Sequence, residues 1–83
     1  MPNATPALRV RTGHVSSSAC ATTHVSVAVL PDGSVRRFYR YASGRVTEAT
    51  TGGEVDYGDC RSTDGAELTR YLRRRLRMAR HVA

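Results

Sequence analysis

The chain has 83 residues, which leaves room for one small domain and excludes large cofactor-binding folds. Leu, Ile, Val and Phe together make up only 15 of these residues, so a core must rest on a few well-placed apolar side chains or on a partner. The net charge is +6, and all 13 basic residues are arginine, whose planar guanidinium suits phosphate and carboxylate. Codon bias in a GC-rich genome is the alternative source of these arginines.

The start of the chain shows no helix or strand pattern. Residues 1–7 contain two prolines and predict a flexible tail, followed by a single small domain over residues 8–83. A short edge strand could begin at residues 8–11, where apolar and basic residues alternate. No basic start leads into an apolar stretch, and no apolar run is long enough to cross a bilayer. We therefore expect a cytoplasmic protein with no membrane partner.

The segment around Pro31 predicts a β-hairpin. Before it, valines alternate with other residues in the period of two that is typical of a strand. Pro31, Asp32 and Gly33 suit a type I turn followed by a left-handed residue, which makes a three-residue hairpin loop. The pairs that this loop sets opposite each other are Val29 and Val35, Val27 and Arg37, and Val25 and Tyr39.

The two faces of this hairpin differ in polarity. The face expected to pack on the core holds Val25, Val27, Val29, Val35, Tyr39 and Tyr41. The face expected to point outward holds His24, Ser26, Ala28, Arg36, Phe38 and Arg40. A two-residue loop would shift the register by one and change the partners. We favour the longer loop because it groups the apolar residues.

A second turn is predicted at residues 43 and 44, after which residues 45–50 return as a third strand. We expect Glu48 on this strand to lie near Tyr39. From there its carboxylate could pair with Arg37, the one charged residue on the apolar face.

The last predicted element is an amphipathic helix over about residues 64–82. Asp64 suits the N-cap, and Glu67 suits the reciprocal bond of a capping box. At about 100° per residue, the apolar arc holds Leu68, Tyr71, Leu72, Leu76, Met78, Ala79 and Val82. The opposite arc presents Arg70, Arg73, Arg74, Arg77 and Arg80. Arg75 falls on the apolar side, where its stem could pack while its head reaches solvent.

Charge follows the chain in three blocks. Residues 1–45 carry +5, residues 46–67 carry −5 and residues 68–83 carry +6. Within the acidic block, residues 54–61 are turn-rich, with at most a short strand around Val55. This block could fold back over the basic end and neutralise it. If it does not, the arginine arc of the helix is open to a polyanion, since each neutralised phosphate releases counterions.

A second binding surface is predicted on the outward side of the hairpin, where Phe38 would lie between Arg36 and Arg40. An aromatic ring between two phosphate ligands is the arrangement by which RNA-binding sheets stack bases. The alternative is that Phe38 lies buried under a loop or the N-terminal segment, because a core would take up the one phenylalanine of the chain.

The remaining reactive residues give no strong signal for catalysis. Cys20 and Cys60 are 40 positions apart and are expected to be reduced thiols; a disulfide that ties two loops is the alternative. His14 and His24 do not complete a zinc spacing with them, so we expect no metal site. No convergent acid–base pair can be placed, so we expect no catalytic residue, no enzymatic activity and no cofactor.

These patterns together predict an α+β fold: a small antiparallel sheet of three to four strands with one C-terminal amphipathic helix packed on one face. The expected core is Val25, Val27, Val29, Val35, Tyr39, Tyr41, Val46, Leu68, Leu72, Leu76 and Ala79. The expected function is a small, non-enzymatic basic protein that contacts nucleic-acid phosphates. Its binding residues would be Arg70, Arg73, Arg74, Arg77, Arg80, Arg36, Phe38 and Arg40. The alternative is an interaction or inhibitor protein that docks on an acidic protein surface, for example an anti-defence protein of the anti-CRISPR type. Monomer and dimer both remain open.

Overall fold

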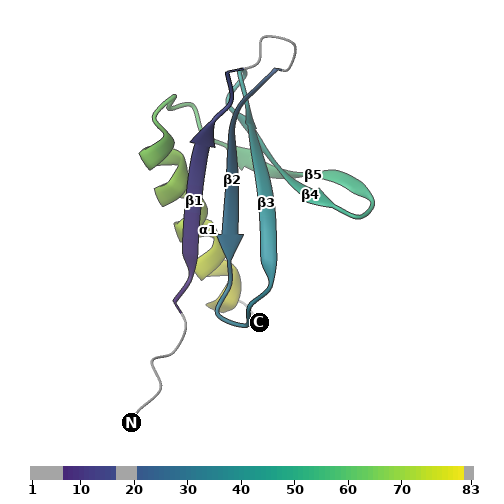
Figure 1. Ribbon diagram of the computed structural model, residues 1–83, viewed down its shortest axis with the longest axis vertical. Coiled ribbons are helices and arrows are strands. Elements are labelled where there is room, and N and C mark those ends of the chain that lie inside the picture. The colour runs from purple at the N-terminus through teal and green to yellow at the C-terminus, as the bar shows by residue number, and fades with distance from the viewer. Residues whose placement is uncertain (1–6, 17–20, 82–83) are drawn as a thin grey trace.

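Five antiparallel strands form one sheet in chain order, and a single helix follows them (Figure 1). The computed structural model describes residues 7–16 and 21–81, the last three by their backbone. The elements are β1 (Arg9–His14), β2 (Thr22–Val29), β3 (Val35–Tyr41), β4 (Arg45–Thr50), β5 (Gly53–Asp59) and α1 (Gly65–His81). The predicted α+β class is confirmed, with five strands rather than three to four. The predicted tail, apart from Ala7, lies outside the described residues.

The β2–β3 hairpin has the predicted loop. The Leu30 N–H donates to the Ser34 carbonyl at 2.9 Å, and the Gly33 N–H donates to the Leu30 carbonyl at 2.9 Å. Gly33 has a φ of 89°, the left-handed conformation that the loop requires. The register is the predicted one and sets Val29 opposite Val35, Val27 opposite Arg37 and Val25 opposite Tyr39.

The outer strands differ from the prediction in length and register. β4 has the predicted bounds, but Glu48 lies opposite Phe38 rather than Tyr39, and it pairs with Arg36 instead of Arg37. β1 extends to His14, and β5 is a full strand of seven residues rather than a short one. In Figure 1, β1 to β3 stand side by side while the β4–β5 hairpin crosses them at an angle, as expected of a twisted sheet.

The helix begins as predicted. The Asp64 Oδ1 accepts a hydrogen bond from the Ala66 N–H at 3.0 Å, which caps the first turn. The Glu67 carboxylate lies 2.5 Å from the Arg70 guanidinium instead of reaching back to the cap. Leu68, Leu72 and Leu76 are buried. Met78 was expected on the apolar arc but is 58% exposed. The side chains of Ala79 and Val82 lie outside the described residues.

The helix covers the opposite face of the hairpin from the one predicted. Figure 1 shows α1 behind the sheet, and the side chains that pack between them include Ala28 and Phe38. The buried apolar cluster is Val10, Ala28, Phe38, Val46, Cys60, Leu68, Leu72 and Leu76. The expected core positions Val46, Leu68, Leu72 and Leu76 are thus confirmed. Six others are wrong, because they lie on the uncovered face: Val25, Val27, Val29, Val35, Tyr39 and Tyr41.

The polar residues beneath the helix find internal partners, which allows this face to be buried. The Thr12 hydroxyl lies 2.7 Å from the Ser26 hydroxyl and 2.7 Å from the Thr69 hydroxyl, and Thr69 donates to the Gly65 carbonyl at 3.0 Å. This chain of hydroxyls connects β2, β1 and α1. Buried polar groups that are hydrogen-bonded cost little free energy, so the face that looked outward by composition can be interior.

No helix in the described part of the chain is long and apolar enough to span a membrane.

Candidate nucleic-acid interface

The outer face of α1 carries a stripe of arginines, as the helical period predicts. Arg70, Arg73, Arg74 and Arg77 recur at spacings of three and four, which places them on one side of the helix. Together with Met78 they line an open hollow of about 390 Å³. Arg74 and Arg77 are exposed, and Arg73 is half-buried. The side chain of Arg80, the fifth predicted member, lies outside the described residues. The four described arginines are called the helix stripe below.

The helix stripe is only partly neutralised. Arg70 pairs with Glu67 one turn earlier. Arg73, Arg74 and Arg77 form no ion pair with any described residue, and the buried Nε of Arg73 has no hydrogen-bond partner among them. A buried donor without a partner is costly unless a ligand or solvent satisfies it. The stripe therefore presents uncompensated positive charge over a little more than one helical turn.

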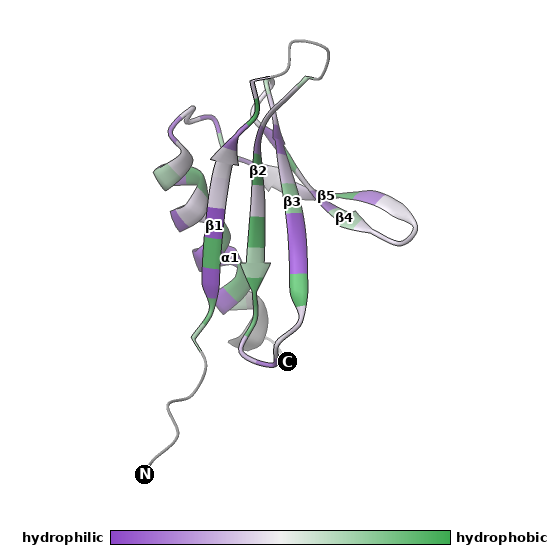
Figure 2. Cartoon of the chain, viewed as in Figure 1, coloured by the Kyte–Doolittle hydropathy of each residue, from purple (hydrophilic) through white to green (hydrophobic). Residues whose placement is uncertain are grey.

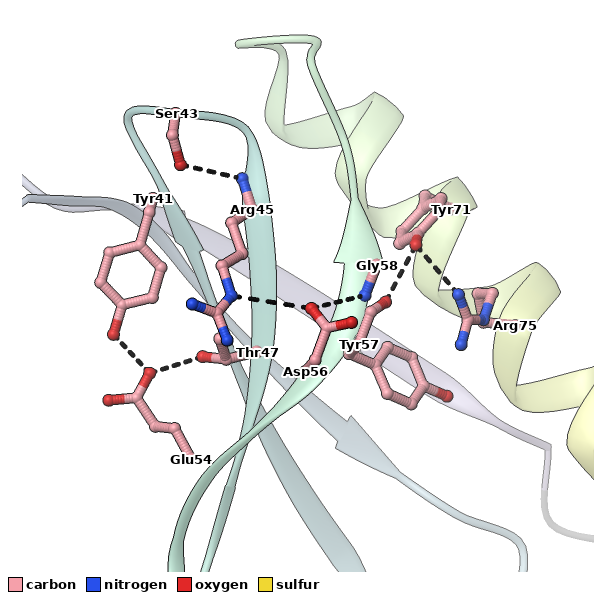
Figure 3. Close-up of polar contacts among 10 residues, drawn as sticks. All are labelled: Tyr41, Ser43, Arg45, Thr47, Glu54, Asp56, Tyr57, Gly58, Tyr71 and Arg75. Carbon is pink, nitrogen blue, oxygen red and sulfur yellow. Dashed lines mark hydrogen bonds and ion pairs between the residues drawn. The ribbon is translucent and has the colours of Figure 1, made fainter.

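Two of the three acidic residues of β5, Glu54 and Asp56, are engaged on the uncovered face of the sheet rather than with the stripe. Glu54 accepts hydrogen bonds from the Thr47 hydroxyl at 2.5 Å and from the Tyr41 hydroxyl, and Asp56 pairs with the Arg45 Nε at 3.6 Å (Figure 3). The hydrogen bonds from Thr47 and Tyr41 hold the pKa of Glu54 below its ordinary value. The same bond to Glu54 raises the pKa of Tyr41. These acids thus have partners of their own.

Phe38 and Arg36 do not form the predicted outward surface. Phe38 is 1% exposed, and its ring packs on Tyr57 with centroids 4.8 Å apart. Arg36 makes a two-point ion pair with Glu48, with both N–O distances 2.6 Å, and its guanidinium lies 5.7 Å from the Phe38 centroid. The hydrogen bond to Glu48 raises the pKa of Arg36. The placement of these residues on an outward face is therefore wrong. Phe38 is buried, as the alternative expected, but against Tyr57 and the leucines of α1 rather than under a loop or the N-terminal segment.

Arg40 is also interior, with 3% of its surface exposed. Its Nε donates to the Cys60 carbonyl at 3.1 Å, its Nη2 donates to the Arg61 carbonyl at 3.1 Å, and its Nη1 donates to the Thr23 hydroxyl at 2.8 Å. The guanidinium thus holds the connection between β5 and α1 against the sheet. A role for Arg40 in binding an external phosphate is inconsistent with this position.

The head of Arg75 was expected to reach solvent, but it contacts two tyrosines of the domain. Its guanidinium lies 4.6 Å from the Tyr57 ring centroid, and its Nη1 donates to the Tyr71 hydroxyl at 3.2 Å. The Tyr71 hydroxyl in turn donates to the Tyr57 carbonyl at 2.9 Å, next to Gly58 (Figure 3). Arg75 therefore joins the helix to β5 and is not a member of the stripe.

Sequence reasoning missed a second group of arginines on the uncovered face. Arg9 and Arg11 on β1 lie opposite Val29 and Val27, and Arg37 on β3 lies opposite Val27 from the other side. All three are exposed. The strand alternation of residues 8–11 was the available signal, but it could not show which face of the sheet stays open.

His14, His24 and Cys60 lie near the end of the sheet that is away from Arg9. His24 is 5% exposed, and the ring centroids of His14 and His24 are 5.3 Å apart. Burial, and then the nearby His14 and Arg40, lower the pKa of His24. Cys60 is a buried free thiol, and Cys20 lies outside the described residues. Within the described ranges, no three His, Cys, Asp or Glu residues are grouped as a metal site.

No protein-family model, no curated protein and no solved structure matches this chain.

Proposed function

We propose that the chain is a non-enzymatic basic protein that binds nucleic-acid phosphates through the helix stripe. The observation that carries this proposal is that Glu67 is the one described acid that pairs with the stripe, while Glu54 and Asp56 contact Tyr41, Thr47 and Arg45 instead. The arginines that remain uncompensated are the adjacent Arg73 and Arg74 and, about one helical turn further on, Arg77. Forked guanidinium groups donate two hydrogen bonds to a phosphate, so such a row suits a backbone of regularly spaced anions.

Contacts of this kind position a protein on nucleic acid without reading its sequence. Arg36, Phe38 and Arg40 are no part of the proposed interface, because their side chains are engaged inside the domain. We expect binding to both DNA and RNA duplexes with little sequence preference. Met78, at the border of the hollow, offers an apolar contact to a sugar or base edge.

The test is a salt titration of affinity for labelled duplex DNA and RNA. Three phosphate contacts, one for each uncompensated arginine, predict a slope of about −3 in log affinity against log salt. The variant Arg74→Gln/Arg77→Gln should reduce this slope by about 2. The matched control, Arg9→Gln/Arg11→Gln, removes the same charge from the uncovered sheet face and should leave the slope unchanged. A flat slope, or equal losses in both variants, would contradict the proposal.

A further inference from the structure

The face of the sheet opposite α1 carries an apolar stripe that nothing in the described chain covers. Val25, Val27 and Val29 run along β2 in the middle of this face, and each is only half-buried. Val35 at the end of β3 is 53% exposed. Figure 2 shows the apolar bands of β2 between strands with strongly polar bands. A continuous apolar stripe on an uncovered face is typical of an interaction surface.

Unpaired positive charge frames this stripe. The strand registers place Arg11, Val27 and Arg37 in one row across β1, β2 and β3. The next row holds Arg9, Val29 and Val35, and Arg9, Arg11 and Val29 line an open hollow of about 390 Å³. None of the three arginines forms an ion pair with a described residue.

The acids of the same face do not supply the missing charge. Glu54 and Asp56 lie on β5, two strands beyond Arg37, and have partners of their own. The uncovered valines and the unpaired guanidinium groups together define the chemistry of a partner that would fit this face. Apolar side chains would cover the valines, and carboxylates beside them would pair with the arginines.

We propose that this face, defined by Val25, Val27, Val29, Arg9, Arg11 and Arg37 and called the valine face, docks an acidic, apolar segment of a partner protein. The proposal goes beyond the phosphate-binding helix and places a second surface on the other side of the sheet. A second copy of the chain is a poorer occupant, because a two-fold interface would bring the same three unpaired arginines against each other. A nucleic acid would leave the valines against phosphate and water.

The experiment selects short random peptides, displayed on phage, against the immobilised full chain after nuclease treatment. We expect the enriched peptides to carry more Asp and Glu than the starting library, with apolar residues between them. One enriched peptide is then synthesised, and its affinity is measured for the wild type and for variants. Its footprint is mapped by the shifts of backbone amide resonances, which should change on β1, β2 and β3.

Three variants decide the site. Arg11→Glu/Arg37→Glu changes exposed positions and should weaken the peptide by about tenfold or more, because like charges then meet across the contact. Val27→Thr keeps a β-branched side chain, so the strand is retained while the apolar contact is reduced. Arg74→Glu/Arg77→Glu, on the helix stripe, is the matched control and should leave the affinity unchanged.

Several results would overturn the proposal: no enrichment, enrichment of basic or neutral peptides, or a peptide that loses affinity in the helix-stripe variant. Sedimentation of the wild type as a dimer that Val27→Thr disrupts would assign the valine face to a second copy. Amide shifts on this face with duplex DNA would assign it to nucleic acid. The salt titration of DNA binding by the helix stripe has its own variants, so failure of one proposal is distinguishable from failure of the other.

Discussion

The two faces of the β2–β3 hairpin carry residues of opposite character and meet opposite environments. On one side, Val25 and Val27 are apolar and remain open to solvent. On the other, Ser26 and Arg40 are polar and are buried beneath the connection to α1 and the helix itself. Average hydropathy alone would assign the faces the other way round.

In a sheet this small, the contacts available inside the domain decide which face of the hairpin is buried. Phe38 has a larger apolar surface than any valine of the open face, and it faces the leucines of α1. The polar residues beside it are tolerated because each has a hydrogen-bond partner inside the domain, as Arg40 has in the Cys60 carbonyl. The valines contribute to strand formation rather than to the core.

Removal of one apolar side chain from each face tests most directly which face contributes to stability. Phe38→Ala should lower the free energy of unfolding by about 3–5 kcal/mol, since it opens a cavity against Tyr57 and the helix. Val27→Ala, on the valine face, should cost about 1 kcal/mol. Urea denaturation followed by far-UV circular dichroism measures both. Equal losses in the two variants would show that the valine face is covered in solution.

The buried arginine gives the next largest effect. Arg40→Met keeps much of the side-chain volume but leaves the carbonyls of Cys60 and Arg61 without a donor, at about 1–3 kcal/mol for each buried group. We expect a total loss of about 3 kcal/mol. Arg37→Met, three positions earlier on the same strand and on the other face, should change stability by about 0.5 kcal/mol or less. Thermal unfolding of the two variants measures both changes in stability. A similar loss of stability in both would place Arg40 in solvent.

Local signals were sufficient to predict several elements. Gly33 and Pro31 predict the hairpin loop and its register, and Asp64 predicts the start of the helix. The helix stripe also follows from sequence, because the 3.6-residue period sorts its arginines onto one side. The pairing of Glu48 was wrong by one residue, since the turn closed by the hydrogen bond from the Gly44 N–H to the Tyr41 carbonyl shifts β4 against β3.

Features that depend on distant parts of the chain could not be predicted in the same way. The choice of face is made by the contact of Phe38 with Tyr57 and by the bonds of Arg40 to the segment after β5. No local pattern encodes either. The exposure of Arg9 and Arg11 follows from that choice, so this part of the valine face was hidden until the sheet and helix were placed together.

The close packing of β5 on α1 is tested by a glycine. Gly58 has a φ of 99°, and a Cβ at this position would lie 2.1 Å from the Tyr71 hydroxyl, which is held by its bond to the Tyr57 carbonyl. Gly58→Ala should therefore cost about 2 kcal/mol from strain and displacement together. Gly33→Ala, at a φ of 89° with open space around it, carries the conformational strain alone and should cost about 1 kcal/mol. Chemical denaturation of both variants separates the two contributions, and an equal loss would mean that Tyr71 moves freely.

The smallest expected effect is a pH dependence that comes from the helix-covered face alone. Burial lowers the pKa of His24 below its ordinary value of 6.5. The charge interactions with His14 and Arg40 lower this pKa further, whereas the interaction with Asp64 raises it. Above that value the imidazole is neutral in both the folded and the unfolded chain. As the pH falls below it, the unfolded chain takes up a proton that the folded chain resists, so stability declines. Glu54, whose pKa is lowered from 4.5, contributes its own loss of stability only at more acidic pH.

The melting temperature should thus fall between about pH 6.5 and pH 5, and His24→Gln should remove most of this slope. His14→Gln should keep most of it, because burial is the largest cause of the shift. A wild-type melting temperature that is constant across this interval would contradict the burial of a neutral His24.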